Sequence, residues 1–254
     1  MTLNEIKTID HFQAFLFGQK DDNFVKSDSP GFSRTICGTN LSSEILYILS
    51  ATERLENIQF YDHLKFITIN NYKIGNRQLE ILTQHRDKLV NVTHLHIWNI
   101  KQNGLDLLSL FPNLTHLLVS YIRKADFSFN GLNHVKHLNT LCLLSANKIS
   151  DFHFLTHSSA SKLRNLSLTY TSSLTSLDGI DKFENLEGLS LYASTPESNK
   201  KVNLDHLSGM ERLTQLRALD IGYFRLDVEE LKKRLSALTA LRQFTVDNIT
   251  YANT

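Results

Sequence analysis

Three histidines are the residues of this chain whose types and spacing could carry out chemistry. His94 and His96 alternate along a short apolar segment, so in a strand their side chains would share one face about 6.6 Å apart. His116 occupies the same place as His94 in the next copy of that segment. Three converging imidazoles could ligate zinc and leave a fourth position open to water or substrate.

The surrounding sequence does not favour a catalytic centre. It has no nearby carboxylate to orient an imidazole and no Glu to act as a base. The phosphate-binding patterns G-x-x-x-x-G-K-[ST] and G-x-G-x-x-G and the nucleophile pattern G-x-S-x-G are absent, and Cys37 and Cys142 stand in no nucleophile signature. We therefore expect a non-enzymatic protein with no cofactor and no bound metal. A metal-dependent enzyme that uses His94, His96 and His116 is the alternative.

The histidines lie within a unit of the form L-x-x-L-x-L that recurs along the chain. Of the 42 leucines, 11 lie in residues 1–100 and 31 in residues 101–254, which points to a repeat. Eight successive units begin at Leu64, Val92, Leu114, Leu138, Leu163, Leu186, Leu216 and Leu241. Their mean spacing of about 25 residues falls within the roughly 20–29 residues of leucine-rich repeats.

Within each unit the apolar pattern is that of a short, half-buried strand. Positions 4 and 6 are apolar, whereas positions 3, 5 and 7 would point to the other face. One such strand cannot bury its apolar side alone, so stacked units should form a parallel sheet over a leucine core. The clearest return helix follows Asp227, which reads as an N-cap with Glu230 three positions on, before Leu231, Leu235 and Leu238 at helical spacing.

These units resemble the leucine-rich-repeat superfamily over about residues 61–254. The segment from Ile149 to Leu186 is similar to the short repeats of bacterial internalins, and the helix after Asp227 to the longer repeats of the ribonuclease-inhibitor class. The resemblance implies an α/β solenoid: a right-handed superhelix with a parallel concave sheet, helices or turns on the convex side, and protein binding on the concave sheet. At position 9, where the family usually places Asn, the chain has Ile100, Ile122, Ala146, Thr171, Ser194, Phe224 and Ile249.

The two ends of the chain differ from the repeats. Residues 1–60 contain no copy of the unit, and apolar residues at helical spacing predict helices near Ile6–Leu16 and around Ser43–Leu55. The sequence therefore predicts a helical N-terminal cap over residues 1–60, in which Phe32–Asn40 could form a degenerate first repeat, and a solenoid of about eight repeats over residues 61–254. A separate functional module is the alternative for the first part. No helix is predicted after the last strand, so we expect that edge to be exposed or to pair with another chain, and a self-associating structural subunit is a further alternative.

Positions 3, 5 and 7 of the units form what we call the concave face. Lys and Glu are nearly absent there, aromatic residues are frequent, and tyrosines recur at position 8 on the edge. This composition is typical of a protein interface, although Tyr, Trp and Thr also favour strands. The predicted partner-binding residues are Phe66, His94, His96, Trp98, His116, Leu118, Tyr121, Tyr170, Tyr192, Asp220 and Tyr223.

Charge and composition narrow the classes of partner. The 254 residues carry 27 Lys and Arg against 26 Asp and Glu, a net charge of +1, which argues against nucleic acid or an anionic membrane as the main partner. No apolar stretch approaches the ~18 residues of a membrane span, and no signal peptide is visible. We expect a cytoplasmic protein, or one exported by an injection system that needs no signal peptide, whose partner is another protein. A bacterial effector, an inhibitor or immunity-type protein and a cytosolic adaptor all fit.

Overall fold

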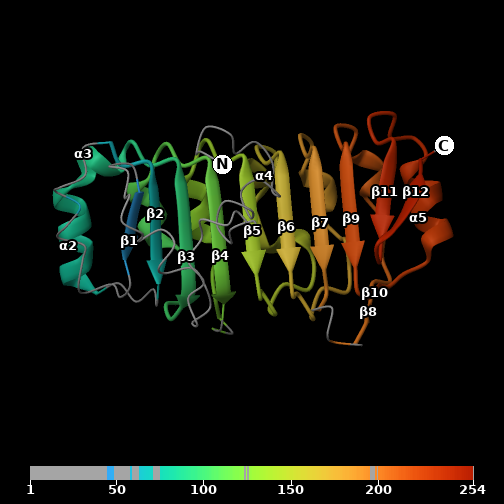
Figure 1. Cartoon of the computed structure of the whole chain (residues 1–254), viewed down its shortest axis with the longest axis horizontal. Coiled ribbons are helices and arrows are strands. Elements are labelled where there is room, and N and C mark those ends of the chain that lie inside the picture. Colours follow the sequence, from blue (N-terminus) through green and yellow to red (C-terminus); the bar gives the residue numbers. More distant parts are fainter. Residues whose placement is uncertain are drawn as a thin grey trace, which may run out of the picture.

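The repeated units of the sequence build one sheet. The computed structural model describes residues 45–48, 58, 63–70, 75–122, 124, 126–194, 198 and 200–253. Within them the sheet has ten strands, which lie side by side in sequence order in Figure 1. They are β1 (Ile45–Ile48), β2 (Phe66–Asn70), β3 (His94–Ile100), β4 (His116–Ile122), β5 (Thr140–Leu144), β6 (Asn165–Thr169), β7 (Gly188–Tyr192), β9 (Ala218–Gly222), β11 (Gln243–Val246) and β12 (Ile249–Ala252). Every neighbouring pair is parallel except β11 with β12.

Equivalent positions of successive units lie at the same level of this sheet. The position-4 leucines Leu95, Leu117 and Leu141 pair in register across β3, β4 and β5, and the register continues through Leu166 and Leu189. All five are buried. The leucines therefore form one continuous core, because each unit covers the apolar side of its neighbour.

The segments that connect the strands contain short helices. In Figure 1 those between β2 and β3 lie at the left end of the sheet, and others lie behind it. They are α2 (Asn76–Gln84), α3 (Arg86–Leu89), α4 (His157–Ala160) and α5 (Val228–Leu235), with the 3-10 helices η3 (Asp106–Leu110), η4 (Asn130–His134), η5 (Phe152–Phe154), η6 (Ile180–Lys182) and η7 (Met210–Arg212). Two short strands, β8 (Val202–Asn203) and β10 (Phe224–Arg225), pair in a separate sheet. This arrangement confirms the predicted α/β solenoid. In the described part of the chain, each helix is too short or too polar to cross a membrane.

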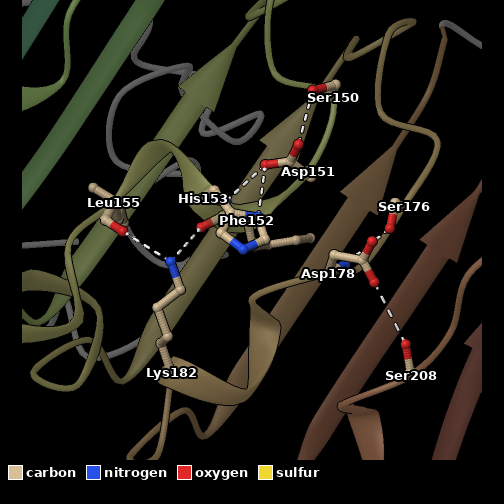
Figure 2. Close-up of polar contacts among 9 residues, drawn as sticks. All are labelled: Ser150, Asp151, Phe152, His153, Leu155, Ser176, Asp178, Lys182 and Ser208. Atoms are coloured by element: carbon tan, nitrogen blue, oxygen red, sulfur yellow. Dashed lines mark hydrogen bonds and ion pairs between the residues drawn. The ribbon is translucent and has the colours of Figure 1, made fainter.

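Side chains on the convex side cap the ends of the short helices (Figure 2). Asp151 accepts a hydrogen bond from the backbone N–H of His153 at 2.8 Å and so caps the start of η5. Lys182, from the next unit, donates from Nζ to the carbonyl oxygens of Phe152 and Leu155 at 3.4 and 3.1 Å. These contacts satisfy backbone groups that a short helix leaves unpaired, and they link successive units. The predicted N-cap of the last helix is confirmed in the same way, since Asp227 accepts from two backbone N–H groups of α5.

The sheet begins one strand earlier than the sequence predicts. The apolar spacing over Ser43–Leu55 predicts a helix, but Ile45–Ile48 forms β1, which pairs in parallel with β2. The prediction was wrong there because a short apolar run fits both periodicities, and the edge of β2 offers it hydrogen-bonding partners. The remaining residues of 1–60, apart from Ile58, lie outside the described residues, so the helical cap and the degenerate repeat stay predictions.

The chain itself covers the edge of β11, which we had expected to be open or to pair with another chain. β12 pairs antiparallel with β11 through a turn at Asp247 and Asn248, whose φ angles are 49° and 66°. Positive φ at both central residues is typical of a type I′ hairpin turn, which Asp and Asn tolerate well. β11 is therefore not the last strand, because the four residues after this turn are long enough to form another one, and β12 ends the sheet in the described residues.

Position 9 of the units belongs to the core rather than to an asparagine ladder. The residues there that are at most 4% exposed are Ile100, Ile122, Ala146, Thr171 and Phe224. Asparagines instead connect units at the residue just before a unit begins. Asn113 donates from Nδ2 to the carbonyl oxygen of Val90 at 2.8 Å, and Asn185 donates to that of Ser161 at 2.7 Å.

Candidate functional site

Most strands of the sheet end in a left-handed corner at position 8 of the unit. The φ angles at these corners lie between 54° and 66°, at Asn99, Tyr121, Ser145, Tyr170, Tyr223 and Asn248. A left-handed conformation costs an L-residue about 1–2 kcal/mol, and Asn bears it better than a bulky side chain does. Tyrosine at three of these corners is therefore an unusual choice of residue.

Large and small side chains alternate from strand to strand at the corners. The register aligns Trp98 with Ser120, Leu144 with Thr169 and Tyr192 with Gly222. Hence β3, β5 and β7 carry a large residue at position 7 and a smaller one at position 8, whereas β4, β6 and β9 have a small residue at position 7 and Tyr at position 8. The outcome is one pair of large side chains for every two strands. The pairs, which we call the corner row, are Trp98 with Tyr121, Leu144 with Tyr170, and Tyr192 with Tyr223.

The corner row is partly exposed along its whole length, since each of its six residues is half-buried. Two of its pairs are in ring contact. The ring centroids of Trp98 and Tyr121 lie 5.1 Å apart, and those of Tyr192 and Tyr223 lie 6.0 Å apart. Such distances are typical of aromatic pairs that stabilise one another, so each pair presents a fixed surface.

The last pair is fixed by polar contacts from the neighbouring strands. Tyr192 donates its hydroxyl to Asp220 Oδ2 at 2.5 Å. Its ring lies over Gly222, where an added Cβ would come within 2.5 Å of Cε1 of the ring. Asp247 Oδ1 accepts from the backbone N–H of Tyr223 at 2.6 Å. Both tyrosines are therefore held in place by β9 and β11.

Hydroxyl groups engage the nitrogens of the three histidines. The rings of His94 and His116 stack, with centroids 4.3 Å apart and planes 9° apart, and Nδ1 of each lies 2.9 Å from the hydroxyl of the preceding threonine. His96 lies between two hydroxyls, with Thr68 2.8 Å from Nδ1 and Ser120 3.2 Å from Nε2. This arrangement connects three strands of the sheet.

Burial keeps these histidines neutral. It lowers the pKa of His94 to about 3, with a further lowering from His116, and it lowers the pKa of His96 to about 3 and of His116 to about 4. Among the described residues, no group of three or more His, Cys, Asp or Glu could hold a metal ion. The geometry is that of a structural hydrogen-bonded cluster.

The predicted partner-binding residues fall into two groups by exposure. Those at most 9% exposed are Phe66, His94, His96, His116 and Leu118. Those that are half-buried are Trp98, Tyr121, Tyr170, Tyr192, Asp220 and Tyr223. Only the second group offers surface to a partner in this structure, and apart from Asp220 it belongs to the corner row.

A hollow of about 530 Å³ lies beside the corner row, on the concave face across β6, β7, β9 and β11. Gly188 and Ala218 occupy position 3 there, and Asn165 lies over Gly188, where an added Cβ would be 2.8 Å from its Oδ1. Arg164 at its rim pairs with Glu187 at 2.8 Å. The hollow adds polar surface next to the aromatic pairs.

Leu144 is the residue of the corner row that the sequence analysis did not select. The signal that could have found it is the alternation of large and small residues at positions 7 and 8 on successive units. The alternation is visible only when positions 7 and 8 are compared with each other, and neither position shows it alone.

Comparisons with known proteins return solved structures of low sequence identity. The sequence matches no protein-family profile and no curated protein. Internalin C2 from Listeria monocytogenes str. 4b F2365 is 14% identical, with 74% of each chain covered and a TM-score of 0.48. An internalin, InlF, from the same organism is also 14% identical, with 72% of this chain and 73% of that chain covered and a TM-score of 0.27. The recurring unit in the sequence and the parallel sheet that its copies form in register give this chain a leucine-rich-repeat solenoid fold.

Proposed function

We propose that the chain is a non-enzymatic module that binds a partner protein through the corner row. The observation that carries the proposal is the placement of tyrosines at left-handed corners on every second strand, at Tyr121, Tyr170 and Tyr223. Each costs backbone energy that Asn or Gly would avoid. Strained residues of this kind cluster at binding sites, where the strain is retained for the sake of the surface.

The composition and size of the corner row also suit a protein interface. Tyr and Trp are the residues most enriched among those that dominate binding energy. From β3 to β9 the row crosses five strand gaps, which at about 4.8 Å each gives a length of roughly 24 Å. Because the sheet hydrogen bonds fix the corners, little conformational entropy would be lost on binding.

The histidine cluster supports a non-enzymatic role. A general base must reach the proton that it abstracts, and a metal ligand needs an available nitrogen. The ring nitrogens of His96 both contact hydroxyls, and its side chain is 0% exposed. The cluster is better suited to hold three strands together than to act on a substrate.

Site-specific photo-crosslinking tests the proposed function. A photoreactive amino acid replaces Tyr170 in one full-length variant and Ser208, which is exposed on the convex side, in a second. Both are irradiated in lysate of the native cells. We expect discrete crosslinked proteins with the label at position 170 and none of them with the label at position 208. Identical products from both positions, or none from either, would contradict the proposal.

A further inference from the structure

The spacing of the corner row indicates the class of partner segment, an inference that rests on the proposed function. Its pairs recur at every second strand, so neighbouring pairs are about 9.6 Å apart and the three pairs span about 19 Å. A linear segment that uses all three pairs must repeat its own side chains at this distance.

Among regular backbone conformations, polyproline II matches that distance best. It has three residues per turn and a rise of about 3.1 Å, which gives a repeat of about 9.3 Å. An extended strand repeats its face at about 6.7 Å. An α-helix repeats at about 10.5 Å over seven residues, so it would be out of step by about 2 Å at the third pair. Over the same length a polyproline II segment is out of step by about 0.6 Å.

The shape of the row fits proline side chains. At position 8, the smaller residues Ser145 and Ala193 lie between Tyr121, Tyr170 and Tyr223, so the tyrosine rings recur on every second strand. Proline-rich segments bind grooves lined by aromatic residues, because their backbone is already ordered and their rings pack against aromatic faces. We propose that the corner row binds a proline-rich segment of the partner protein in the polyproline II conformation, with one three-residue turn on each pair.

The charge beside the row specifies the segment further. Lys101, Lys124 and Lys148 follow the corners of β3, β4 and β5 by two or three residues, and all three are exposed. None of them forms an ion pair with another residue that the structure describes. Three lysines that follow consecutive strands complement negative charge. The end of the partner's proline-rich segment that lies over β3–β5 therefore carries acidic residues.

Binding of a defined peptide tests the inference. The probe is a capped nine-residue peptide of three Pro-Pro-Glu triplets, titrated into the full-length protein by calorimetry. Trp98 is the single tryptophan of the chain and lies in the first pair, so its fluorescence reports the same event. We expect saturable binding and a change in fluorescence, and at least tenfold weaker binding when the prolines are replaced by glycines, which do not hold the polyproline II conformation.

Matched variants assign the binding to the row. Tyr170→Asn removes a ring at a corner whose conformation Asn adopts at Asn99 and Asn248, and we expect it to weaken binding about tenfold or more. Ser208→Asn introduces the same residue on the convex side, outside the row, and should bind within about threefold of the unaltered protein. Circular dichroism verifies that each variant is folded.

Several outcomes would overturn the inference. The first is that the proline peptide does not bind at a concentration of 1 mM. The second is that the glycine peptide binds as tightly as the proline peptide. The third is that a folded Tyr170→Asn variant binds the proline peptide as tightly as the unaltered protein does. A soluble oligosaccharide that binds in place of the peptide and is lost in Tyr170→Asn would identify the row as a sugar site instead. If the peptide fails while position 170 still crosslinks to a partner protein, the proposed function stands and only the class of segment is wrong.

Discussion

The ring of Tyr192 lies across Gly222 of the neighbouring strand, so closely that a Cβ on the glycine would be 2.5 Å from the ring. This contact explains why a residue without a side chain stands at position 7 of β9. It also lets the tyrosine hydroxyl reach Asp220. The large residue at position 7 of one strand therefore packs directly on the small residue at position 7 of the next strand, so the two positions are coupled in size.

Substitution of Gly222 should disturb its packing against the ring of Tyr192. We expect Gly222→Ala to displace the ring of Tyr192 and to lower the free energy of unfolding by about 1–3 kcal/mol, as overpacking does. Urea denaturation measures the loss. In a Tyr192→Ala background the same substitution should cost much less, because the ring is gone. An equal cost in both backgrounds would show that the two residues are not coupled.

The left-handed corners predict an unusual response to glycine. Ser145 has φ 59° and donates its backbone N–H to the carbonyl oxygen of Thr169 at 2.7 Å. Ser145→Gly keeps this hydrogen bond and removes the cost of the left-handed conformation. The removed backbone cost is larger than the penalty from the greater conformational entropy of glycine in the unfolded chain. We therefore expect the free energy of unfolding to rise by up to about 1 kcal/mol.

The same substitution within a strand supplies the control. Ser190 lies in the middle of β7 and has no positive φ, so Ser190→Gly should lower the free energy of unfolding by roughly 0.5–1 kcal/mol. Thermal or urea denaturation of the two variants gives the comparison. Loss of stability in both would mean that the corner at Ser145 carries no strain.

The repeat was predictable because the spacing of leucines along the sequence defines it. The unit beginning at Val92 and the unit beginning at Leu114 were aligned by their leucines alone, and the structure pairs His94 with His116 as that alignment requires. The N-cap at Asp227 was predictable too, because its signal is local.

The corners and the burial of the histidines were not predictable in this way. Asn99, Tyr121 and Ser145 share the left-handed conformation, yet no shared residue type marks it, because the neighbouring strand rather than the local sequence imposes it. The same limit applies to His96. Its alternation with His94 predicts a shared face, but its complete burial depends on packing that periodicity does not describe.

The buried histidines predict that stability falls with acid. Their folded pKa values of about 3 to 4 lie below the ordinary 6.5, so the unfolded chain binds protons first. The stabilising effect is complete above about pH 6.5 and is lost as the pH falls from there through the folded pKa values, about 4 for His116 and about 3 for His94 and His96. Each histidine contributes a slope of up to about 1.4 kcal/mol per pH unit. Urea denaturation between pH 6.5 and 5 measures it, before most carboxylates titrate.

A histidine variant identifies the source of that slope. His116→Phe keeps a ring stacked on His94 but removes one titrating group, so the slope should fall by up to about 1.4 kcal/mol per pH unit. A slope that is unaffected by His116→Phe would assign the acid sensitivity to other groups.

One side-chain amide contacts three backbone carbonyl groups at the C-terminal end of the described sheet. Asn253 Nδ2 lies 3.0, 3.2 and 2.9 Å from the carbonyl oxygens of Leu235, Leu238 and Leu241, so it caps both α5 and the turn before β11. Asn253→Ala removes this donor. The carbonyl oxygens of Leu235 and Leu238 still accept from backbone N–H groups, so the loss falls mainly on the carbonyl of Leu241 and should cost about 1–3 kcal/mol in the free energy of unfolding. Asn253→Asp should cost more at neutral pH, because a carboxylate would face three carbonyl oxygens. Its extra cost should diminish as the carboxyl is protonated and regains a donor. Equal stability of Asn253→Asp and the unaltered protein at neutral pH, measured by urea denaturation, would mean that the amide does not hold this end together.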